Sequence, residues 1–168
     1  LDQRGVDAVN ATTSTSFAAD LRKWLSLTQG YAEGRHAYHA TMPTDTLAHN
    51  VELMAEATRR GLPELRAAQV ELGGRVRALL AERGLASVAA PGFEASSVVV
   101  VHTHDPGLKS GATFVSAGLQ AAGGVPLMCG EPDDFSTFRL GLFGLDKWAD
   151  VDGTVTRLAL GLDRALAS

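Results

Sequence analysis

Apolar residues recur at helical spacing in three stretches of the first half of the chain. Near residues 16–29 one helical face carries four apolar side chains, Phe17, Leu21, Trp24 and Leu25. A second stripe begins after Thr44, a residue type suited to a helix N-cap, and ends at Gly61. A third begins at Pro63, a residue favoured in the first helical turn, and ends at Gly84. We therefore expect three helices in this half of the chain.

The second half of the chain opens with a change from helical to extended patterning. Residues 96–101 form a short β-branched run between turn signals, which predicts a well-covered strand. Residues 109–121 predict a short helix, and residues 125–129 and 136–143 predict two further strands. Asp150 can cap a final amphipathic helix that runs to the end of the sequence.

The order of these elements predicts the fold class. From residue 44 the order is helix, helix, strand, helix, strand, strand, helix. The last two strands are joined by the short acidic turn 131–134, and strands joined in this way pair antiparallel. We expect an α/β chain of the α+β type, with a small, mostly antiparallel sheet and helices packed mainly on one face.

Composition and charge narrow the function classes. Apolar residues make up 45% and charged residues 20% of the 168 positions, as in globular proteins. The net charge is −4 and no basic run occurs, so we expect no binding to nucleic acid or membranes. No stretch of about 18 apolar residues and no secretory signal is evident. The single cysteine excludes an intramolecular disulfide, and we expect a cytoplasmic protein.

The histidines and the cysteine form no recognised catalytic or metal-binding pattern. His36 and His39 lie in a predicted loop, and no acidic residue completes a spacing such as HExxH. His102 and His104 lie near a predicted strand end. No metal site is therefore expected. Cys129 has no basic partner in the sequence, and we expect it to be a small buried apolar side chain.

Arg139 is the clearest candidate for a ligand-binding residue. It lies in a predicted apolar strand, where Phe138 and Leu140 face one side. Arg139 and Gly141 then face the other side. A guanidinium offers parallel N–H donors that suit a carboxylate, and the missing side chain of Gly141 leaves room beside it. The pattern leaves open whether Arg139 anchors a carboxylate or is a partly exposed arginine on an edge strand.

Three segments, taken in order, resemble a known family. Residues 38–43 read Tyr-His-Ala-Thr-Met-Pro and look like the family's Tyr-His-x-Thr-x-Pro connector. The helix pair that follows, with Arg-Arg-Gly-Leu at 59–62 between the helices, is similar in length. Residues 138–144 read Phe-Arg-Leu-Gly-Leu-Phe-Gly and resemble the family's Arg-Ile-Gly strand before an Asp-capped last helix. The family is the class V, fold-type I pyridoxal-phosphate (PLP) enzymes, specifically the alanine–glyoxylate or serine–pyruvate aminotransferase group.

The resemblance implies roles for three residues. Arg139 would hold the α-carboxylate of the amino-acid or keto-acid substrate. Tyr38 and Thr41 would donate hydrogen bonds to the PLP phosphate in the neighbouring subunit's site, so the enzyme would be a homodimer. The alternative is that Tyr38 and Thr41 only pack the connector. The implied reaction moves an amino group between an α-amino acid and an α-keto acid, such as alanine or serine with glyoxylate or pyruvate.

The sequence lacks one motif of this family, the segment that carries the lysine to which PLP is bound. The family binds PLP through a Schiff-base lysine in a Ser-x-x-Lys type segment, and an upstream aspartate holds the pyridinium nitrogen. The chain has three lysines, Lys23, Lys109 and Lys147, and none lies in such a segment. We therefore expect a C-terminal portion of such an enzyme, beginning at Leu1 without a methionine and inactive alone. Residues 1–43 would end the large domain and form the dimer-contacting connector, and residues 44–168 would form the C-terminal small domain.

Two other functions remain open at the level of the sequence. Class V also includes desulfurases and lyases, but a desulfurase needs a mobile nucleophilic cysteine and Cys129 is expected in a β-like segment. A stand-alone α/β module could bind a carboxylate ligand through Arg139 without catalysis. A Ser-x-x-Lys segment encoded upstream of Leu1 would decide for an enzyme.

Overall fold

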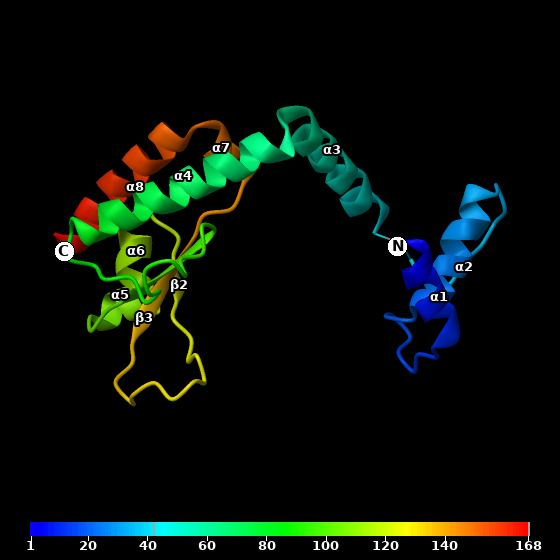
Figure 1. Ribbon diagram of the computed structural model, residues 1–168, viewed down its shortest axis with the longest axis horizontal. Coiled ribbons are helices and arrows are strands. Elements are labelled where there is room, and N and C mark those ends of the chain that lie inside the picture. Colours follow the sequence, from blue (N-terminus) through cyan, green and yellow to red (C-terminus); the bar gives the residue numbers. More distant parts are fainter. Residues whose placement is uncertain (42, 168) are drawn as a thin grey trace. The chain divides into compact units, whose positions relative to one another are not determined.

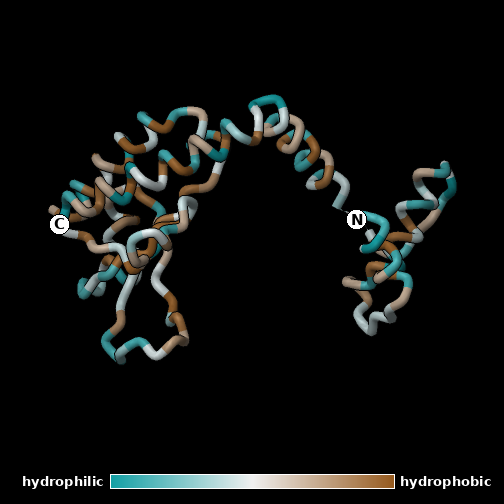
Figure 2. Tube along the Cα trace, in the orientation of Figure 1, coloured by the Kyte–Doolittle hydropathy of each residue, from teal (hydrophilic) through white to brown (hydrophobic). Residues whose placement is uncertain are grey.

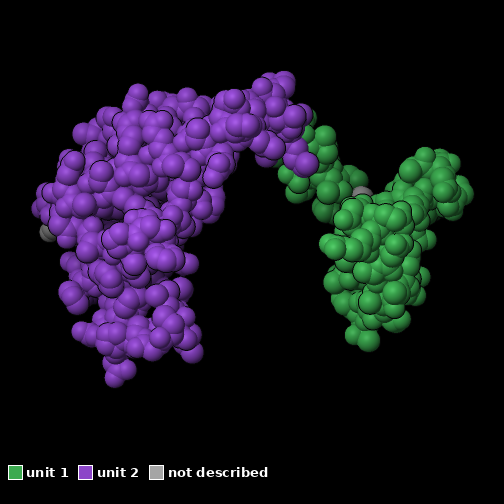
Figure 3. Space-filling view, in the orientation of Figure 1, with its two compact units in different colours: residues 1–52 green, residues 53–168 purple. Residues whose placement is uncertain are grey.

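The structure, a computed structural model, describes residues 1–41 and 43–167 and divides into two compact units (Figure 3). Unit 1 covers residues 1–52 and unit 2 covers residues 53–168, so the boundary falls inside helix α3 (Thr44–Arg60). The predicted boundary after residue 43 concerns the domains of a longer enzyme and stays a prediction. In the described part of the chain, no helix is both long and apolar enough to cross a lipid bilayer.

Unit 1 begins with two helices, α1 (Gln3–Ala11) and α2 (Leu21–Ala32) (Figure 1). The sequence pattern missed α1. Its nine residues include the poor helix formers Gly5 and Asn10, and none of them is buried. The carboxylate of Asp2 accepts a hydrogen bond from Gly5 N at 2.8 Å, and this cap stabilises the start of the helix.

The start of α2 differs from the predicted helix at residues 16–29. The Asp20 side chain accepts a hydrogen bond from Lys23 N at 3.2 Å and caps the helix there. Phe17 therefore lies outside α2 and is exposed, so the predicted start is four or five residues too early.

Helix α3 ends before Gly61, as the sequence predicts. Gly61 has φ +91°, a left-handed conformation that costs glycine no Cβ clash. The expected N-cap is displaced by one residue, because Thr44 is already helical and Leu47 N donates to Pro43 O at 3.0 Å. Hydrophobic and hydrophilic residues alternate along α3 (Figure 2), yet none of its described residues is buried.

Unit 2 is built on a three-stranded antiparallel sheet, as the predicted fold class requires. The strands are β1 (Val98–His102), β2 (Ala122–Gly123) and β3 (Thr137–Gly141), with β3 in the middle. The register pairs Arg139 of β3 with Val100 of β1 and with Ala122 of β2. The β-branched run of β1 and the alternation along β3 explain why both longer strands form where they were predicted.

Helices cover one face of this sheet. They are α4 (Leu62–Ala81), α5 (Pro106–Ser110), α6 (Ala112–Ser116), α7 (Leu145–Ala149) and α8 (Val151–Leu166). Helix α4 lies beside α8 and contacts β1 (Figure 1). The inward side chains of β1 and β3 share one core with helical residues, which are Leu72, Val76, Leu80, Leu108, Phe114, Leu162 and Ala165. The rings of Phe114 and Phe138 lie 4.8 Å apart inside this core.

Two elements predicted between β1 and β3 are wrong. The predicted helix at 109–121 is replaced by two short helices, because Gly111 takes φ +83° and interrupts the run. The predicted strand at 125–129 is a loop. The backbone N–H groups of Leu127, Met128 and Cys129 donate to the Glu131 carboxylate, so they are not available to a neighbouring strand. The strand that does pair with β3 lies earlier, at β2.

Candidate functional site

Arg139 lies on the middle strand of the sheet, with β1 on one side and β2 on the other. The alternative of an edge-strand arginine is therefore wrong. Phe138 and Leu140 are buried against the helices, whereas Arg139 is half-buried and Gly141 is exposed. The predicted alternation is confirmed, and it places Arg139 on the sheet face opposite the helices. Substrate binding by Arg139 stays a prediction.

One nitrogen of the Arg139 guanidinium forms a hydrogen bond within the protein, and the other two nitrogens remain available to a ligand. Its Nε–H donates to the carbonyl oxygen of Gly123 at 3.0 Å. Among the described residues this guanidinium forms no other hydrogen bond and no ion pair, so Nη1 and Nη2 keep their donors. Two parallel N–H groups on these nitrogens can bind both oxygens of one carboxylate. A Cβ on Gly141 would meet only the Phe143 ring within 4 Å, so this face is open beside Arg139.

In unit 1 the connector is anchored by His39. The His39 ring lies 4.4 Å from the Phe17 ring and 5.5 Å from the Trp24 ring, measured between centroids. Its Nε2 is 3.0 Å from the carbonyl oxygen of Phe17, and Trp24 Nε1 donates to the carbonyl oxygen of Ala18 at 2.8 Å. These contacts fix the connector to the start of α2.

The hydroxyl groups of Tyr38 and Thr41 converge on the exposed side of the connector. Tyr38 Oη and Thr41 Oγ1 are 3.5 Å apart, and the Tyr38 side chain is 71% exposed. Two adjacent hydroxyls can donate to the oxygens of one anion, so the pair fits a phosphate group. The structure thus brings Tyr38 and Thr41 together in unit 1, while Arg139 belongs to unit 2.

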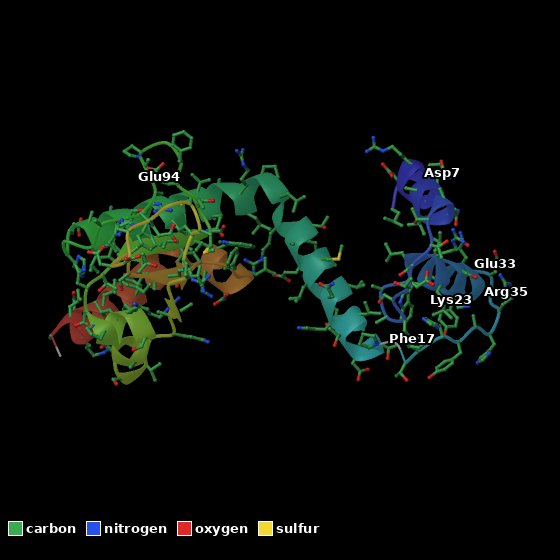
Figure 4. The ribbon with its side chains drawn as sticks, turned by 90° about the horizontal axis from the view of Figure 1, so that it is seen from below. Asp7, Phe17, Lys23, Glu33, Arg35 and Glu94 are labelled. Atoms are coloured by element: carbon green, nitrogen blue, oxygen red, sulfur yellow. The ribbon has the colours of Figure 1, made fainter. Side chains whose placement is uncertain are left out.

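The remaining candidates are dispersed. The His102 ring packs edge-on against the Phe135 ring at 5.6 Å, and His36 and His104 are exposed. Across residues 1–41 and 43–167, no three His, Cys, Asp or Glu side chains are grouped so that they could hold a metal ion. Lys23 is exposed on α2 (Figure 4).

Cys129 is exposed, so the expectation of a buried apolar side chain is wrong. The cause is the loop after β2. Cys129 N donates to Glu131 Oε2 at 2.9 Å and Met128 N donates to Glu131 Oε1 at 2.9 Å, which turns the backbone back on itself. The sequence signalled a turn here through its acidic residues and Pro132, but not the carboxylate that the backbone wraps around.

The Glu131 carboxylate in this loop has a strongly lowered pKa. Hydrogen bonds from backbone N–H groups, with that of Cys129 contributing most, lower the pKa of Glu131 to about 2. The loop borders a hollow of about 600 Å³ that Lys109 and Thr137 also line. Arg139 does not line that hollow, so the carboxylate-binding hypothesis depends on the open Nη groups of Arg139 and not on the hollow.

The Glu131 loop should loosen only in strong acid. Because the folded-state pKa lies below the ordinary 4.5, the stability from this carboxylate is complete above about pH 4.5 and is lost as the pH falls toward 2. NMR should show the side-chain carboxyl carbon of Glu131 and the amides of Met128 and Cys129 titrating together in that range. In Glu131→Gln, which keeps one acceptor oxygen but no charge, these amides should stop titrating there. A Glu131 midpoint near 4.5 would contradict the hydrogen bonds.

Comparison with known proteins defines the class of fold. No protein-family model and no curated protein matches the chain. Among solved structures 23 chains match, and one is the crystal structure of an alanine–glyoxylate aminotransferase from Nostoc sp.. The TM-score is 0.75 at 16% sequence identity, and the match covers 99% of this chain. The fold is therefore that of the C-terminal portion of an aminotransferase. The chain spans 42% of the length of that neighbour.

Proposed function

We propose that this chain is the C-terminal portion of a PLP-dependent aminotransferase of class V, fold type I, in the alanine–glyoxylate or serine–pyruvate group. The reaction would transfer an amino group between an α-amino acid and an α-keto acid. The fold match supports the proposal, since it extends over 99% of the chain. The observation that carries it is Arg139, an arginine on a central strand with its Nη groups open.

Arg139 would bind and orient the substrate. Both oxygens of an α-carboxylate would accept hydrogen bonds from Nη1 and Nη2, while Nε stays on Gly123 O. Because the arginine is half-buried, water competes less for these bonds than on an open surface. Amino-acid donors and keto-acid acceptors both carry this carboxylate, so one anchor serves both halves of the transfer.

Tyr38 and Thr41 would hold the cofactor phosphate. Their hydroxyls, 3.5 Å apart and exposed, fit that group as donors. PLP, when bound, supplies an electron sink for the bonds at the amino-acid α-carbon. The same proposal makes the enzyme a homodimer, in which these hydroxyls serve the neighbouring subunit's site. The single cysteine is compatible with a cytoplasmic location. Since no lysine of this chain lies in the family's motif, the chain alone is not expected to transfer amino groups.

A desulfurase is less well supported than an aminotransferase. The exposed loop position of Cys129 removes one argument against it. The surroundings of Cys129 still argue against it, because Glu131 holds its backbone N–H and Asp133 and Asp134 follow. A nucleophilic cysteine is usually found beside a positive charge instead.

Isotope transfer tests the proposed function. The intact enzyme that contains this chain, supplied with PLP, ¹⁵N-alanine and glyoxylate or ¹⁵N-serine and pyruvate, should place the ¹⁵N label on the former keto acid. Omitting PLP should abolish the transfer. If the enzyme, supplied with cysteine and a thiol reductant, released sulfide and alanine but transferred no label, this would contradict an aminotransferase and favour the desulfurase.

The two hydroxyl groups proposed to bind the PLP phosphate allow a second test of the same function. Replacing Tyr38 with Phe and Thr41 with Val removes both hydroxyls and keeps the side-chain shapes. The PLP concentration needed for half-maximal transfer should rise about tenfold or more, since a hydrogen bond to a charged group typically contributes about 1.5–3 kcal/mol. If the PLP concentration for half-maximal transfer were unchanged, Tyr38 and Thr41 would only pack the connector.

A further inference from the structure

Two glycines at the end of β2 let this strand lie close to its neighbours. Gly124 N donates to Thr137 O at 2.9 Å, and a Cβ on Gly124 would overlap Thr137, with the Thr137 carbonyl carbon 2.7 Å away. A Cβ on Gly123 would lie 3.0 Å from the carbonyl oxygen of Lys109 in α5. Side chains are therefore excluded at Gly124 and crowded at Gly123, and glycine permits the close approach.

The close approach places a backbone carbonyl beside Arg139. Ala122 is the cross-strand partner of Arg139, and the next carbonyl, that of Gly123, accepts the Arg139 Nε–H at 3.0 Å. Nε joins the guanidinium plane to its aliphatic chain, so a hydrogen bond there restricts rotation of the plane. Nη1 and Nη2 are left open. The acceptor itself is held in place, because β2 is paired with β3.

We propose that the Gly123–Gly124 segment is a positioning element that orients the Arg139 guanidinium before a carboxylate ligand binds. The proposal rests on the proposed function only for the identity of that ligand. Ordering a long, freely rotating side chain opposes binding, and a side chain that is already fixed binds more tightly for the same contacts. The glycines act through Arg139 and need not touch the ligand.

Two alanine substitutions separate positioning from a general effect of replacing glycine. Gly124→Ala should push β2 away from β3, because its Cβ would overlap the Thr137 backbone. The core of β1, β3 and the helices includes no residue of β2, so the unit should stay folded. Gly74→Ala is the matched control, since Gly74 is exposed on α4 and a Cβ there would meet no heavy atom within 4 Å.

The hydrogen bond is measured first, by NMR on the 168-residue chain. The Arg139 Nε–H, assigned by its disappearance in Arg139→Lys, should exchange slowly with water and show a scalar coupling to the Gly123 carbonyl carbon. Both signatures should persist in Gly74→Ala and be lost in Gly124→Ala. Fast exchange and no coupling in the unmodified chain would overturn the proposal, whether or not Gly124→Ala folds.

Carboxylate binding is measured second, with pyruvate as the probe and neutral pyruvamide as its control. Gly124→Ala should bind pyruvate about tenfold more weakly than the unmodified chain, and Gly74→Ala should bind it equally well. Equal pyruvate affinity in Gly124→Ala, with the coupling lost, would overturn the positioning role and leave the proposed function standing. An unmodified chain that shows the coupling but binds pyruvate no better than pyruvamide would contradict carboxylate binding by Arg139, the observation on which the proposed function depends, and would still support the orienting hydrogen bond.

Discussion

If the intact protein is the aminotransferase proposed above, replacing Arg139 with alanine should lower its kcat/KM roughly 30- to 1000-fold, which corresponds to about 2–4 kcal/mol of transition-state binding. The reason is the loss of the two proposed hydrogen bonds to the substrate carboxylate. Each such bond to a charged group typically contributes about 1.5–3 kcal/mol, and the two are not additive. Steady-state kinetics on two amino donors, with PLP occupancy checked by absorbance, measures the effect.

Two further variants control this result. Arg139→Lys should recover only part of the activity, because an ammonium keeps the charge but cannot present two parallel N–H groups. Arg66→Ala, at an exposed position of α4, should leave kcat/KM unchanged. If Arg139→Ala impaired one donor and spared the other, or spared both, Arg139 would not be the α-carboxylate anchor.

Replacing Phe138 with alanine should cost about 3–5 kcal/mol of the free energy of unfolding, a large share of the roughly 5–15 kcal/mol typical of a domain. Phe138 is fully buried beside Phe114, and its loss leaves a cavity in the core under the sheet. Phe143→Ala is the matched control, since its side chain is 58% exposed and should change stability by less than about 0.5 kcal/mol. Urea denaturation of the 168-residue chain measures both.

This pair of substitutions also tests the side of the sheet on which Arg139 lies. Alternation along β3 puts Phe138 and Arg139 on opposite faces. If Phe143→Ala were costly and Phe138→Ala changed stability by less than about 0.5 kcal/mol, the two faces would be assigned wrongly, and Arg139 would face the core.

The longer elements could be predicted because each carries a repeated signal. β1 has a run of β-branched residues, β3 alternates, and Asp150 caps α8 by accepting a hydrogen bond from Gly153 N at 2.8 Å. β2 has only two residues, so no periodicity can reveal it. The prediction of one helix over 109–121 fails at Gly111, because the sequence does not show that the φ of Gly111 is +83°.

Some residues of the candidate site could be predicted from the sequence, but the contacts that position them could not. Arg139 stood out because a charged residue in an apolar strand is unusual. Its bond to Gly123 depends on the register of β2 against β3, which local sequence does not specify. Tyr38 and Thr41 came from the resemblance to the aminotransferases, and the structure adds that their hydroxyls converge. The exposure of Cys129 was missed because it depends on a hydrogen-bonded turn around Glu131.

Carboxylate binding by Arg139 is tested most directly by a crystal structure of the intact protein with a substrate amino acid or a stable analogue. Both oxygens of the α-carboxylate should lie about 2.7–2.9 Å from Arg139 Nη1 and Nη2, while Arg139 Nε remains bonded to Gly123 O. A carboxylate held by another cation, with the Arg139 guanidinium turned away from it, would contradict the proposed role of Arg139.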